Sequence, residues 1–314
     1  MQKLAIILPC YNEEEILPQT IATIKKLLNN LIKLKKVSPA SKICFVNDGS
    51  KDKTLEIIRK TCLKDKMFCC INLSRNFGHQ GAILAGMNEL SADLYVTIDA
   101  DLQDNPECIC EMLEKIDEGC DIVYGVRKSR TTDSWFKRTT ATCYYRLLKL
   151  LGVNIVYNHA DFRMMTKRAV ETLKQFPERN LFLRAIVPLI GFKYAKVYYD
   201  RTKRQAGETK YPLPKMVALA WNGISNFSII PLRFVTFSGF FVCFLSFIFL
   251  CYVVYNWSAK GTIVGWASTV TIITIFSGIQ LISLGIIGEY LAKVFIEVKK
   301  RPLYIVESKI GCEN

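Results

Sequence analysis

The stretch Leu94–Gln103 reads LYVTIDADLQ, and it holds both the pattern that predicts the fold and the pattern that predicts the site. Its first five residues are apolar, aromatic or β-branched, which predicts a strand buried on both faces. Asp99, Asp101 and Gln103 follow at alternate positions. Oxygens spaced in this way at the end of a strand can converge on one hard cation, such as Mg²⁺ or Mn²⁺. A surface turn of acidic residues is the alternative for any single pattern of this kind.

Earlier segments repeat the arrangement of an apolar run that ends in polar turn residues. The expected strands cover residues 4–8, 43–46, 68–73 and 94–98, and the expected helices cover residues 14–36, 54–64 and 81–89. Strands that alternate with helices predict an α/β fold with a Rossmann-like, mostly parallel sheet. Such sheets bind their ligands beyond the carboxyl ends of the strands, so we expect the site at that edge.

The chain lacks the glycine-rich sequences that hold phosphates in many nucleotide-binding proteins. Neither GxxxxGK[ST] nor GxGxxG follows an expected strand. A nucleotide in this fold would therefore need its diphosphate charge neutralised by a metal ion. At the same edge, Tyr11 could stack on a base or pack on the edge of the sheet, and Asp48 could accept an N–H from a base. The alternative for Asp48 is an Asx turn with Gly49.

The composition combines positive charge with a high apolar content. Lys and Arg number 42 against 28 Asp and Glu, the formal net charge is +14, and half of the residues are hydrophobic. The mean hydropathy is +0.18. This hydrophobicity argues against intrinsic disorder, and it does not fit the polar surface of a nucleic-acid-binding protein. A basic face held against anionic lipid explains both properties.

Two long segments, residues 234–259 and 261–288, contain no charged side chain. Each exceeds the roughly 20 residues that a helix needs to cross a bilayer core. We therefore predict two transmembrane helices, at about residues 234–257 and 265–289, with buried helices of a soluble core as the alternative.

The charges beside these segments predict the topology. The flanks of the hairpin carry Arg233, Lys293, Lys299, Lys300 and Arg301, whereas the intervening loop carries Lys260. By the positive-inside rule, the large N-terminal part and both termini are cytoplasmic. We expect a multi-pass protein of the inner (plasma) membrane.

These predictions divide the chain into four parts. They are an α/β domain at residues 1–210, a juxtamembrane amphipathic region at 211–232, the two transmembrane helices within 233–292, and a cytoplasmic tail at 293–314. Residues 177–192 and 214–230 are candidates for amphipathic helices in the membrane interface, with core packing as the alternative.

Several motifs occur in order along the chain and together resemble one family. They are PCYNEE at residues 9–14, NDGS at 47–50, DADLQD at 99–104, DFR at 161–163, QAGETKY at 205–211, GEY at 288–290 and VKKRP at 298–302. This set resembles the family 2 glycosyltransferases of the GT-A fold, in the polyprenyl-phosphate branch that includes dolichol-phosphate mannose synthases and bactoprenol glucosyltransferases. The resemblance covers nearly the whole chain. Many members carry two acidic residues before the glycine of the second motif, whereas this chain has Asn47 and Asp48.

The resemblance implies a role for each motif. Nucleotide-sugar binding falls to Pro9, Tyr11, Glu13, Asp48, Asp99, Ala100 and Asp101. Asp99, Asp101 and Gln103 would bind Mg²⁺ or Mn²⁺, and Asp99, Asp101 and Asp161 would be catalytic. Acceptor or phosphate binding falls to Arg127, Arg138, Arg204 and Lys210. Asp161 is the implied general base, but a phosphate monoester acceptor is largely ionised at pH 7. Orienting the acceptor and pairing with Arg163 are therefore alternatives for Asp161.

The implied activity is that of a membrane-bound, inverting, metal-dependent glycosyltransferase. It would move glucose from UDP-glucose to undecaprenyl phosphate, giving a lipid-linked sugar for modification of cell-surface glycans such as O-antigen lipopolysaccharide. GDP-mannose or a UDP-N-acetylhexosamine is the alternative donor, and a homo-oligomer such as a tetramer is also implied. A non-catalytic, nucleotide-sensing membrane adaptor is the alternative from another class, and no nucleic-acid partner is expected.

Overall fold

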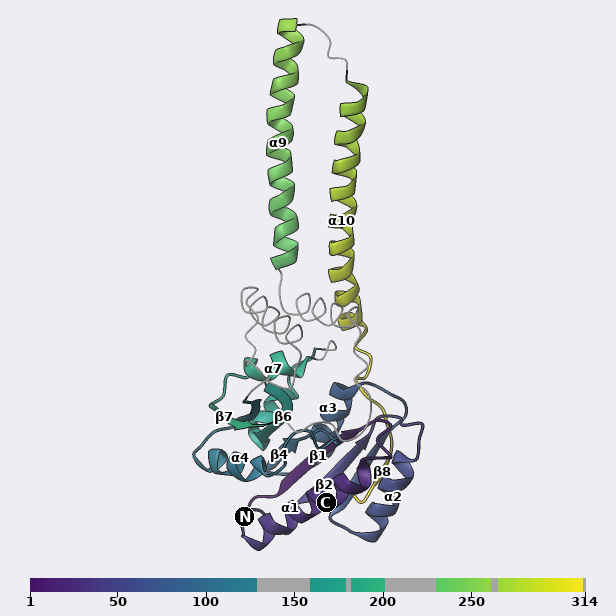
Figure 1. Cartoon of the computed structure of the whole chain (residues 1–314), viewed down its shortest axis with the longest axis vertical. Coiled ribbons are helices and arrows are strands. Elements are labelled where there is room, and N and C mark those ends of the chain that lie inside the picture. The colour runs from purple at the N-terminus through teal and green to yellow at the C-terminus, as the bar shows by residue number, and fades with distance from the viewer. Residues whose placement is uncertain (129–158, 179–181, 201–229, 261–264, 313–314) are drawn as a thin grey trace. The chain divides into compact units, whose positions relative to one another are not determined.

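The computed structural model describes residues 1–128, 159–178, 182–200, 230–260 and 265–312, and its chain divides into two compact units. The first unit is the α/β part together with the last residues of the chain, and the second contains two long helices (Figure 1). The strands are β1 Leu4–Cys10, β2 Lys42–Asn47, β3 Phe68–Leu73, β4 Leu94–Thr97, β5 Ile122–Arg127, β6 His159–Thr166, β7 Tyr194–Tyr199 and β8 Val306–Ile310. The helices of the first unit are α1 Leu17–Lys33, α2 Thr54–Lys64, α3 His79–Glu89, α4 Cys108–Asp117, α6 Lys167–Leu173 and α7 Leu183–Leu189.

The described strands form one eight-stranded sheet in the order β7-β5-β6-β4-β1-β2-β3-β8. β4, β1, β2 and β3 are parallel neighbours, as the alternating pattern predicts. The sheet is mostly parallel, as predicted, because six of its strands run in one direction: β1, β2, β3, β4, β5 and β7. β6 is antiparallel to both β4 and β5, and β8 is antiparallel to β3, so the sheet is mixed. The α/β class is confirmed.

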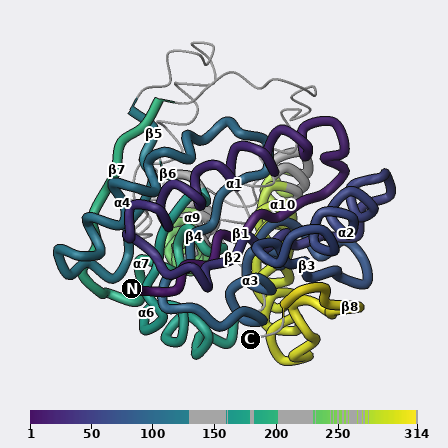
Figure 2. The backbone as a smooth tube through the Cα atoms, turned by 90° about the horizontal axis from the view of Figure 1, so that it is seen from below, coloured from purple at the N-terminus to yellow at the C-terminus, as the bar shows by residue number. Residues whose placement is uncertain are grey.

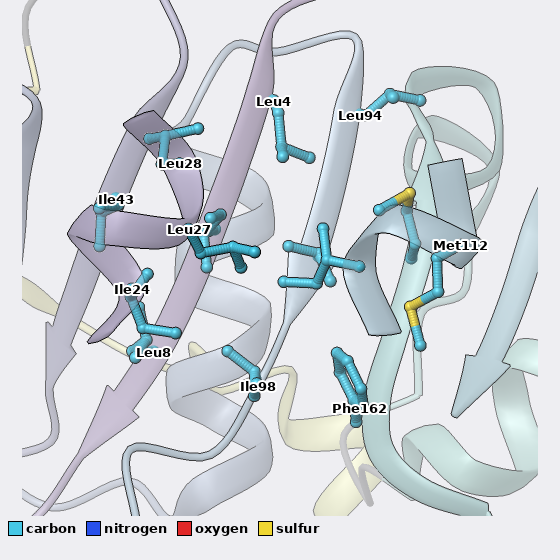
Figure 3. Close-up of a cluster of buried hydrophobic side chains, with 14 of the residues drawn as sticks. Leu4, Leu8, Ile24, Leu27, Leu28, Ile43, Leu94, Ile98, Met112 and Phe162 are labelled. Carbon is cyan, nitrogen blue, oxygen red and sulfur yellow. The ribbon is translucent and has the colours of Figure 1, made fainter. Parts of the chain in front are cut away.

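One face of the sheet carries the main hydrophobic core, covered by α1, α2 and α4. Figure 3 shows part of this core, with Ile24 and Leu28 of α1 and Met112 of α4 beside residues of the strands. Leu4 and Leu8 of β1 point to this face because side chains alternate along a strand. Ile24 and Leu28 of α1 meet it because residues four apart share one face of a helix. Each fully buried leucine or isoleucine contributes about 1.5–3 kcal/mol relative to exposure. This core fixes the strands whose ends carry the site.

The opposite face is covered by α3, which packs on β1, β2 and β3. Seven consecutive residues of this helix, Gly81–Met87, are buried. A Cβ atom added at Gly86 would lie 2.4 Å from Cγ2 of Ile7. The helix therefore packs so close to β1 that only glycine fits at this position. α3 therefore has a fixed position, and its first turn lies at the edge where β3 ends.

The segment at residues 177–192 is predicted to lie either in the membrane interface or in the core. In its described part it forms α7. Leu183, Ala185, Ile186 and Val187 are buried, and α7 packs on β6. Core packing is therefore the observed role of this helix. The other candidate interfacial segment, residues 214–230, lies outside the described residues except for Ile230.

The end of the chain differs from the predicted tail. Residues 293–299 continue the last long helix, and residues 306–310 form β8, which pairs with β3 at the sheet edge (Figure 2). Exposure alternates along this strand, with Glu307 and Lys309 exposed and the residues between and beside them half-buried, which suits a strand with one covered face. Its pairing with β3 is a long-range contact that local pattern does not reveal.

The second unit contains α9, Ile230–Lys260, and α10, Trp266–Lys299. α9 extends beyond both ends of its predicted span, 234–257, whereas α10 extends beyond only the C-terminal end of its predicted span, 265–289. Within the residues that the structure describes, Ile275–Lys299 is long and apolar enough to cross a membrane by length and composition, and Leu232–Val242 is a shorter apolar segment. A hairpin of two membrane spans therefore stays a prediction.

Candidate active site

The strand directions bring distant parts of the chain to one edge of the sheet. β1, β2, β3 and β4 are parallel, so their carboxyl ends meet there. β6 runs the opposite way, with Arg163 opposite Thr97, and its first residues therefore reach the same edge. Asp161 consequently lies beside the segment that follows β4. The hydroxyl of Thr97 donates a hydrogen bond to the backbone oxygen of Asp161 and joins the two strands there.

The segment Asp99–Gln103 leaves β4 in a tight, strained turn. Leu102 has a φ of +54°, a left-handed conformation that is uncommon for a bulky side chain. Such backbone strain persists where surrounding structure enforces it, often at functional sites. Here Asp101 Oδ1 accepts a hydrogen bond from the Gln103 N–H (3.2 Å), and Thr20 of α1 donates to the Ala100 oxygen (2.7 Å). Ala100 is itself buried, so its predicted contribution to nucleotide binding can come from its backbone alone.

Carboxylates crowd this turn. Burial, together with the nearby charges of Asp104, Asp161 and Asp101, raises the pKa of Asp99 to about 6 against the opposing effect of His79. A divalent cation would relieve this excess negative charge, and carboxylate and amide oxygens are the donors that Mg²⁺ and Mn²⁺ prefer. The predicted ligands therefore fit such an ion.

The protein offers only part of a coordination shell at this turn. In the described part of the chain, no three His, Cys, Asp or Glu side chains are grouped so as to hold a metal ion together. Mg²⁺ is commonly bound by one or two carboxylates and completed by substrate phosphates and water. The donor set of Asp99, Asp101 and Gln103 matches that type of site.

His79 is a site residue that the sequence analysis missed. It begins α3, and its Nε2 lies 3.4 Å from Asp99 Oδ1 and 3.6 Å from Asp161 Oδ2. Burial lowers the pKa of His79, but the carboxylates of Asp161 and Asp99 outweigh it and raise the pKa overall. The imidazole therefore links the candidate metal turn to Asp161. The sequence GHQG at residues 78–81 was the available signal, but it is too short to interpret alone.

Asp161 is held by two guanidinium groups. Its carboxylate accepts hydrogen bonds from Arg163 Nη2 at 2.5 Å and from Arg184 Nη2 at 2.9 Å. Arg163 is completely buried and also donates to the Leu183 oxygen. Burial raises the pKa of Asp161, but Arg184, His79 and Arg163 together bring it well below its usual range.

These contacts bear on the predicted role of Asp161. A carboxylate with a lowered pKa is a weak base, because its ionised form is stabilised by its neighbours. The geometry therefore favours the alternative in which Asp161 pairs with Arg163 and orients its neighbours. Arg184, which lies in α7, is a second site residue that the sequence analysis missed. The residues around it are apolar, and this pattern indicates packing and not a site.

Asp48 is buried and anchors a neighbouring loop. Its Oδ1 accepts from the Phe77 N–H (2.7 Å) and its Oδ2 from the Gly78 N–H (2.9 Å). Burial raises the pKa of Asp48, although these amides act in the opposite direction. Gly49 has a φ of +67°, and an added Cβ would lie 2.5 Å from the backbone of Arg75. The loops after β2 and β3 are thus locked together, and each Asp48 oxygen keeps a second lone pair for a ligand.

The loop after β1 is tied to the loop after β2. The Asn12 N–H donates to Ser50 Oγ (3.1 Å), the Lys51 N–H donates to Asn12 Oδ1 (2.8 Å), and the Glu13 N–H donates to Thr54 Oγ1 (2.9 Å). Among the residues predicted to bind the nucleotide, Tyr11 is 42% exposed and Glu13 is half-buried. Pro9 is buried within β1 opposite Val46, so it shapes the strand.

The predicted acceptor-binding residues are distributed differently. Arg127 ends β5, and its Nη2 lies 3.8 Å from Asp104 Oδ1. Burial lowers the pKa of Arg127, but Asp104 and Tyr199 outweigh it and raise the pKa overall. The other three residues, Arg138, Arg204 and Lys210, lie outside the described residues.

The edge where the parallel strands end thus joins a strained acidic turn, a histidine and two guanidinium groups, and it is at this edge that open α/β sheets bind their ligands. Comparison with known protein families shows that the chain belongs to glycosyl transferase family 2, whose model matches residues 5–174. The uncharacterised glycosyltransferase YkoT of Bacillus subtilis is 48% identical, with 97% of this chain and 91% of YkoT aligned. The SfII prophage-derived bactoprenol glucosyl transferase of Shigella flexneri is 37% identical over 97% of both chains. Glucosyl-3-phosphoglycerate synthase of Mycobacterium tuberculosis, crystallised with Mn²⁺, UDP and phosphoglyceric acid, superposes with a TM-score of 0.46 at 18% identity, covering 71% of this chain and 76% of the synthase.

Proposed function

We propose that this glycosyltransferase is membrane-bound, inverting and metal-dependent, and that it transfers glucose from UDP-glucose to undecaprenyl phosphate. The observation that carries the proposal is the meeting of Asp99 and Asp161 at His79, beside Arg184, at the edge where the strands end. The donor and acceptor are supported by the full-length similarity to proteins named bactoprenol glucosyl transferase.

On the donor side, the loops after β1 and β2 would hold the nucleoside. Tyr11 offers an exposed ring for stacking on the base, and Asp48 offers acceptor lone pairs at a fixed position. Asp99, Asp101 and Gln103 would hold the divalent ion, which when bound offsets the charge of the leaving nucleoside diphosphate.

On the acceptor side, the reaction requires no strong protein base. A lipid phosphate monoester has a second pKa near 6, so its oxygen is already ionised at pH 7. That oxygen attacks the anomeric carbon opposite the leaving group. The bond from this carbon to the UDP oxygen breaks as the new bond to the phosphate oxygen forms, and the configuration inverts. Arg184, positioned by Asp161, and Arg127 at the end of β5 supply positive charge for the phosphates.

The second unit supports a membrane location. Its helices expose large apolar side chains such as Phe234, Phe240 and Leu281, each at least 69% exposed. Lipid is the environment in which such surfaces are stable. We infer that α9 and α10 cross the inner membrane as a hairpin, with the α/β unit and both termini in the cytoplasm.

A transfer assay tests the proposal. Membranes that contain the full chain are incubated with undecaprenyl phosphate and a panel of labelled UDP- and GDP-sugars, and label is counted in the lipid extract. We expect incorporation from UDP-glucose that is lost in Asp101→Asn and kept in Asp117→Asn, a matched change at an exposed carboxylate of α4. Incorporation from another nucleotide-sugar alone would overturn the donor assignment. No incorporation from any donor would favour a non-catalytic adaptor.

A further inference from the structure

We propose that the C-terminal strand β8 is part of the nucleoside side of the site, because Glu307 sets the hydrogen-bond direction of a relay through Asn72 and Asn47. The relay ends at the loop of residues 47–50. The inference depends on the proposed function in one respect, namely that the ligand of this loop is a nucleoside.

The relay crosses three adjacent strands, β8, β3 and β2. Asn72 Nδ2 donates to Glu307 Oε2 at 2.6 Å, and Asn47 Nδ2 donates to Asn72 Oδ1 at 2.7 Å. Asn47 Oδ1 in turn accepts from the Ser50 N–H at 3.4 Å. Every hydrogen bond in this series therefore points from the loop after β2 toward the carboxylate of β8.

The two amides in the middle of the relay are buried. Asn47 is 1% exposed and Asn72 is 2% exposed, whereas Glu307 lies on the exposed side of β8. A buried amide that loses a partner is costly, so the two asparagines must keep complementary orientations. Each amide can in principle turn by 180° and exchange its donor and acceptor ends.

Glu307 fixes the orientation from the β8 end of the relay, as the Ser50 N–H does from the other end. An ionised carboxylate accepts hydrogen bonds and cannot donate them, so it holds Asn72 with its Nδ2 outward and its Oδ1 toward Asn47. Water in the place of Glu307 would both donate and accept, and would allow the reversed orientation. In the reversed relay, Asn47 would present its Nδ2 to the Ser50 N–H, and two donors would face each other.

The orientation matters to the loop that faces the ligand. Ser50 Oγ accepts from the Asn12 N–H, so Ser50 connects the relay to the loop that carries Tyr11. Asp48, the candidate contact to the base, directly follows Asn47. A displaced Ser50 would therefore move the residues on both sides of the nucleoside position.

The relay requires an amide and not an acid at position 47. A carboxylate at position 47 would face Asn72 Oδ1, and two acceptors would meet in a buried place. The amide of Asn47 supplies the donor that the relay requires. β8 follows α10 in the sequence. The last described strand therefore contributes to the same site as the loop after β1, the first strand.

A paired substitution tests the inference in the full-length protein in detergent. Asn72→Asp places two carboxylates against each other at the Glu307 end, while position 72 still accepts from Asn47. Adding Glu307→Gln to Asn72→Asp restores a donor at that end. Controls are Asn30→Asp and Glu56→Gln, the same changes at exposed positions of α1 and α2. UDP affinity is measured by calorimetry with Mg²⁺ present, and folding is followed by thermal unfolding.

We expect Asn72→Asp to weaken UDP binding by about tenfold and the double variant to return to within about threefold of wild type, since a charged hydrogen bond is lost and then replaced. Both controls should leave the affinity unchanged. Unaltered UDP affinity in a folded Asn72→Asp protein, or a double variant no better than the single one, would overturn the relay while leaving the proposed function intact. If Asn72→Asp does not fold, Glu307→Ala carries the test, and wild-type affinity in that variant would overturn the relay. A wild-type protein that binds neither UDP nor GDP would instead overturn the proposed function.

Discussion

Replacing Asp161 by Asn removes the negative charge that neutralises Arg163, and the structure gives the size of the effect. Arg163 is fully buried, and its Nη2 lies 2.5 Å from Asp161 Oδ1. Breaking a buried ion pair by removing one partner costs about 3–5 kcal/mol, because an uncompensated charge stays in the interior. For a folded unit of this size, that corresponds to a fall in melting temperature of roughly 6–20 °C.

The assay is thermal unfolding of the full chain in detergent, with Asp117→Asn as the control for loss of a carboxylate. The double variant Asp161→Asn with Arg163→Met removes both buried charges and should recover part of the stability, because an apolar replacement of a buried pair is often neutral. An Asp161→Asn protein that melts within about 2 °C of wild type would refute the reasoning.

The same variant separates the two roles of Asp161. If Asp161 positions Arg184 and His79, the residual transfer activity of Asp161→Asn should keep the pH profile of the wild type at a lower level. If Asp161 is a general base, its removal should make the residual activity rise with pH as hydroxide takes over the proton. That second profile would contradict the positioning role.

Three other perturbations have defined outcomes. Gly49→Ala should destabilise the protein and raise the Kd for UDP, because Gly49 has a positive φ and the added Cβ would lie 2.5 Å from backbone atoms. The control is Gly78→Ala, also at positive φ but with open space around the added Cβ. Its effect on stability and on the Kd should be smaller. Tyr199→Phe should lower the free energy of unfolding by about 1–3 kcal/mol, because a buried carboxylate loses its 2.6 Å hydrogen bond, whereas the exposed Tyr198→Phe should change little. The folded-state pKa of Asp161 is lowered, so its stabilisation is present above about pH 4 and lost as the pH falls further. Asp161 also raises the pKa of His79, and that contribution is present below about pH 6.5 and lost as the pH rises through the raised pKa. The difference in melting temperature between wild type and Asp161→Asn should therefore be largest at about pH 5 to 6 and shrink on both sides, and a constant difference from about pH 3 to 8 would contradict this.

The sequence predicts the part of the fold that depends on local pattern. The buried strands β1 to β4 and the helices between them follow from apolar runs bounded by turn residues, and the turn at Asp99–Gln103 follows from its position after β4. The carboxyl ends of neighbouring parallel strands lie at the same edge of the sheet, which predicts that Asp48 and Asp99 lie at one edge.

What the sequence does not predict depends on contacts between distant segments. β6 and β8 pair antiparallel to strands far away in the chain, and no local period encodes that choice. His79 and Arg184 reach Asp161 only because α3 and α7 lie beside the start of β6, and each residue is unremarkable in its own segment. For the same reason, the low pKa of Asp161 and its weakness as a base emerge from the folded structure.

Sugar transfer before and after removal of divalent metal tests whether the turn after β4 binds the metal and the nucleotide-sugar. Label from UDP-glucose is counted in the lipid extract for wild type and for Asp101→Asn, first with EDTA and then with excess Mg²⁺ or Mn²⁺. We expect that EDTA abolishes transfer by wild type, that added metal restores it, and that Asp101→Asn stays inactive in both conditions. Undiminished transfer in EDTA, or wild-type transfer by Asp101→Asn, would contradict the assignment of the turn after β4 as the metal and nucleotide-sugar site.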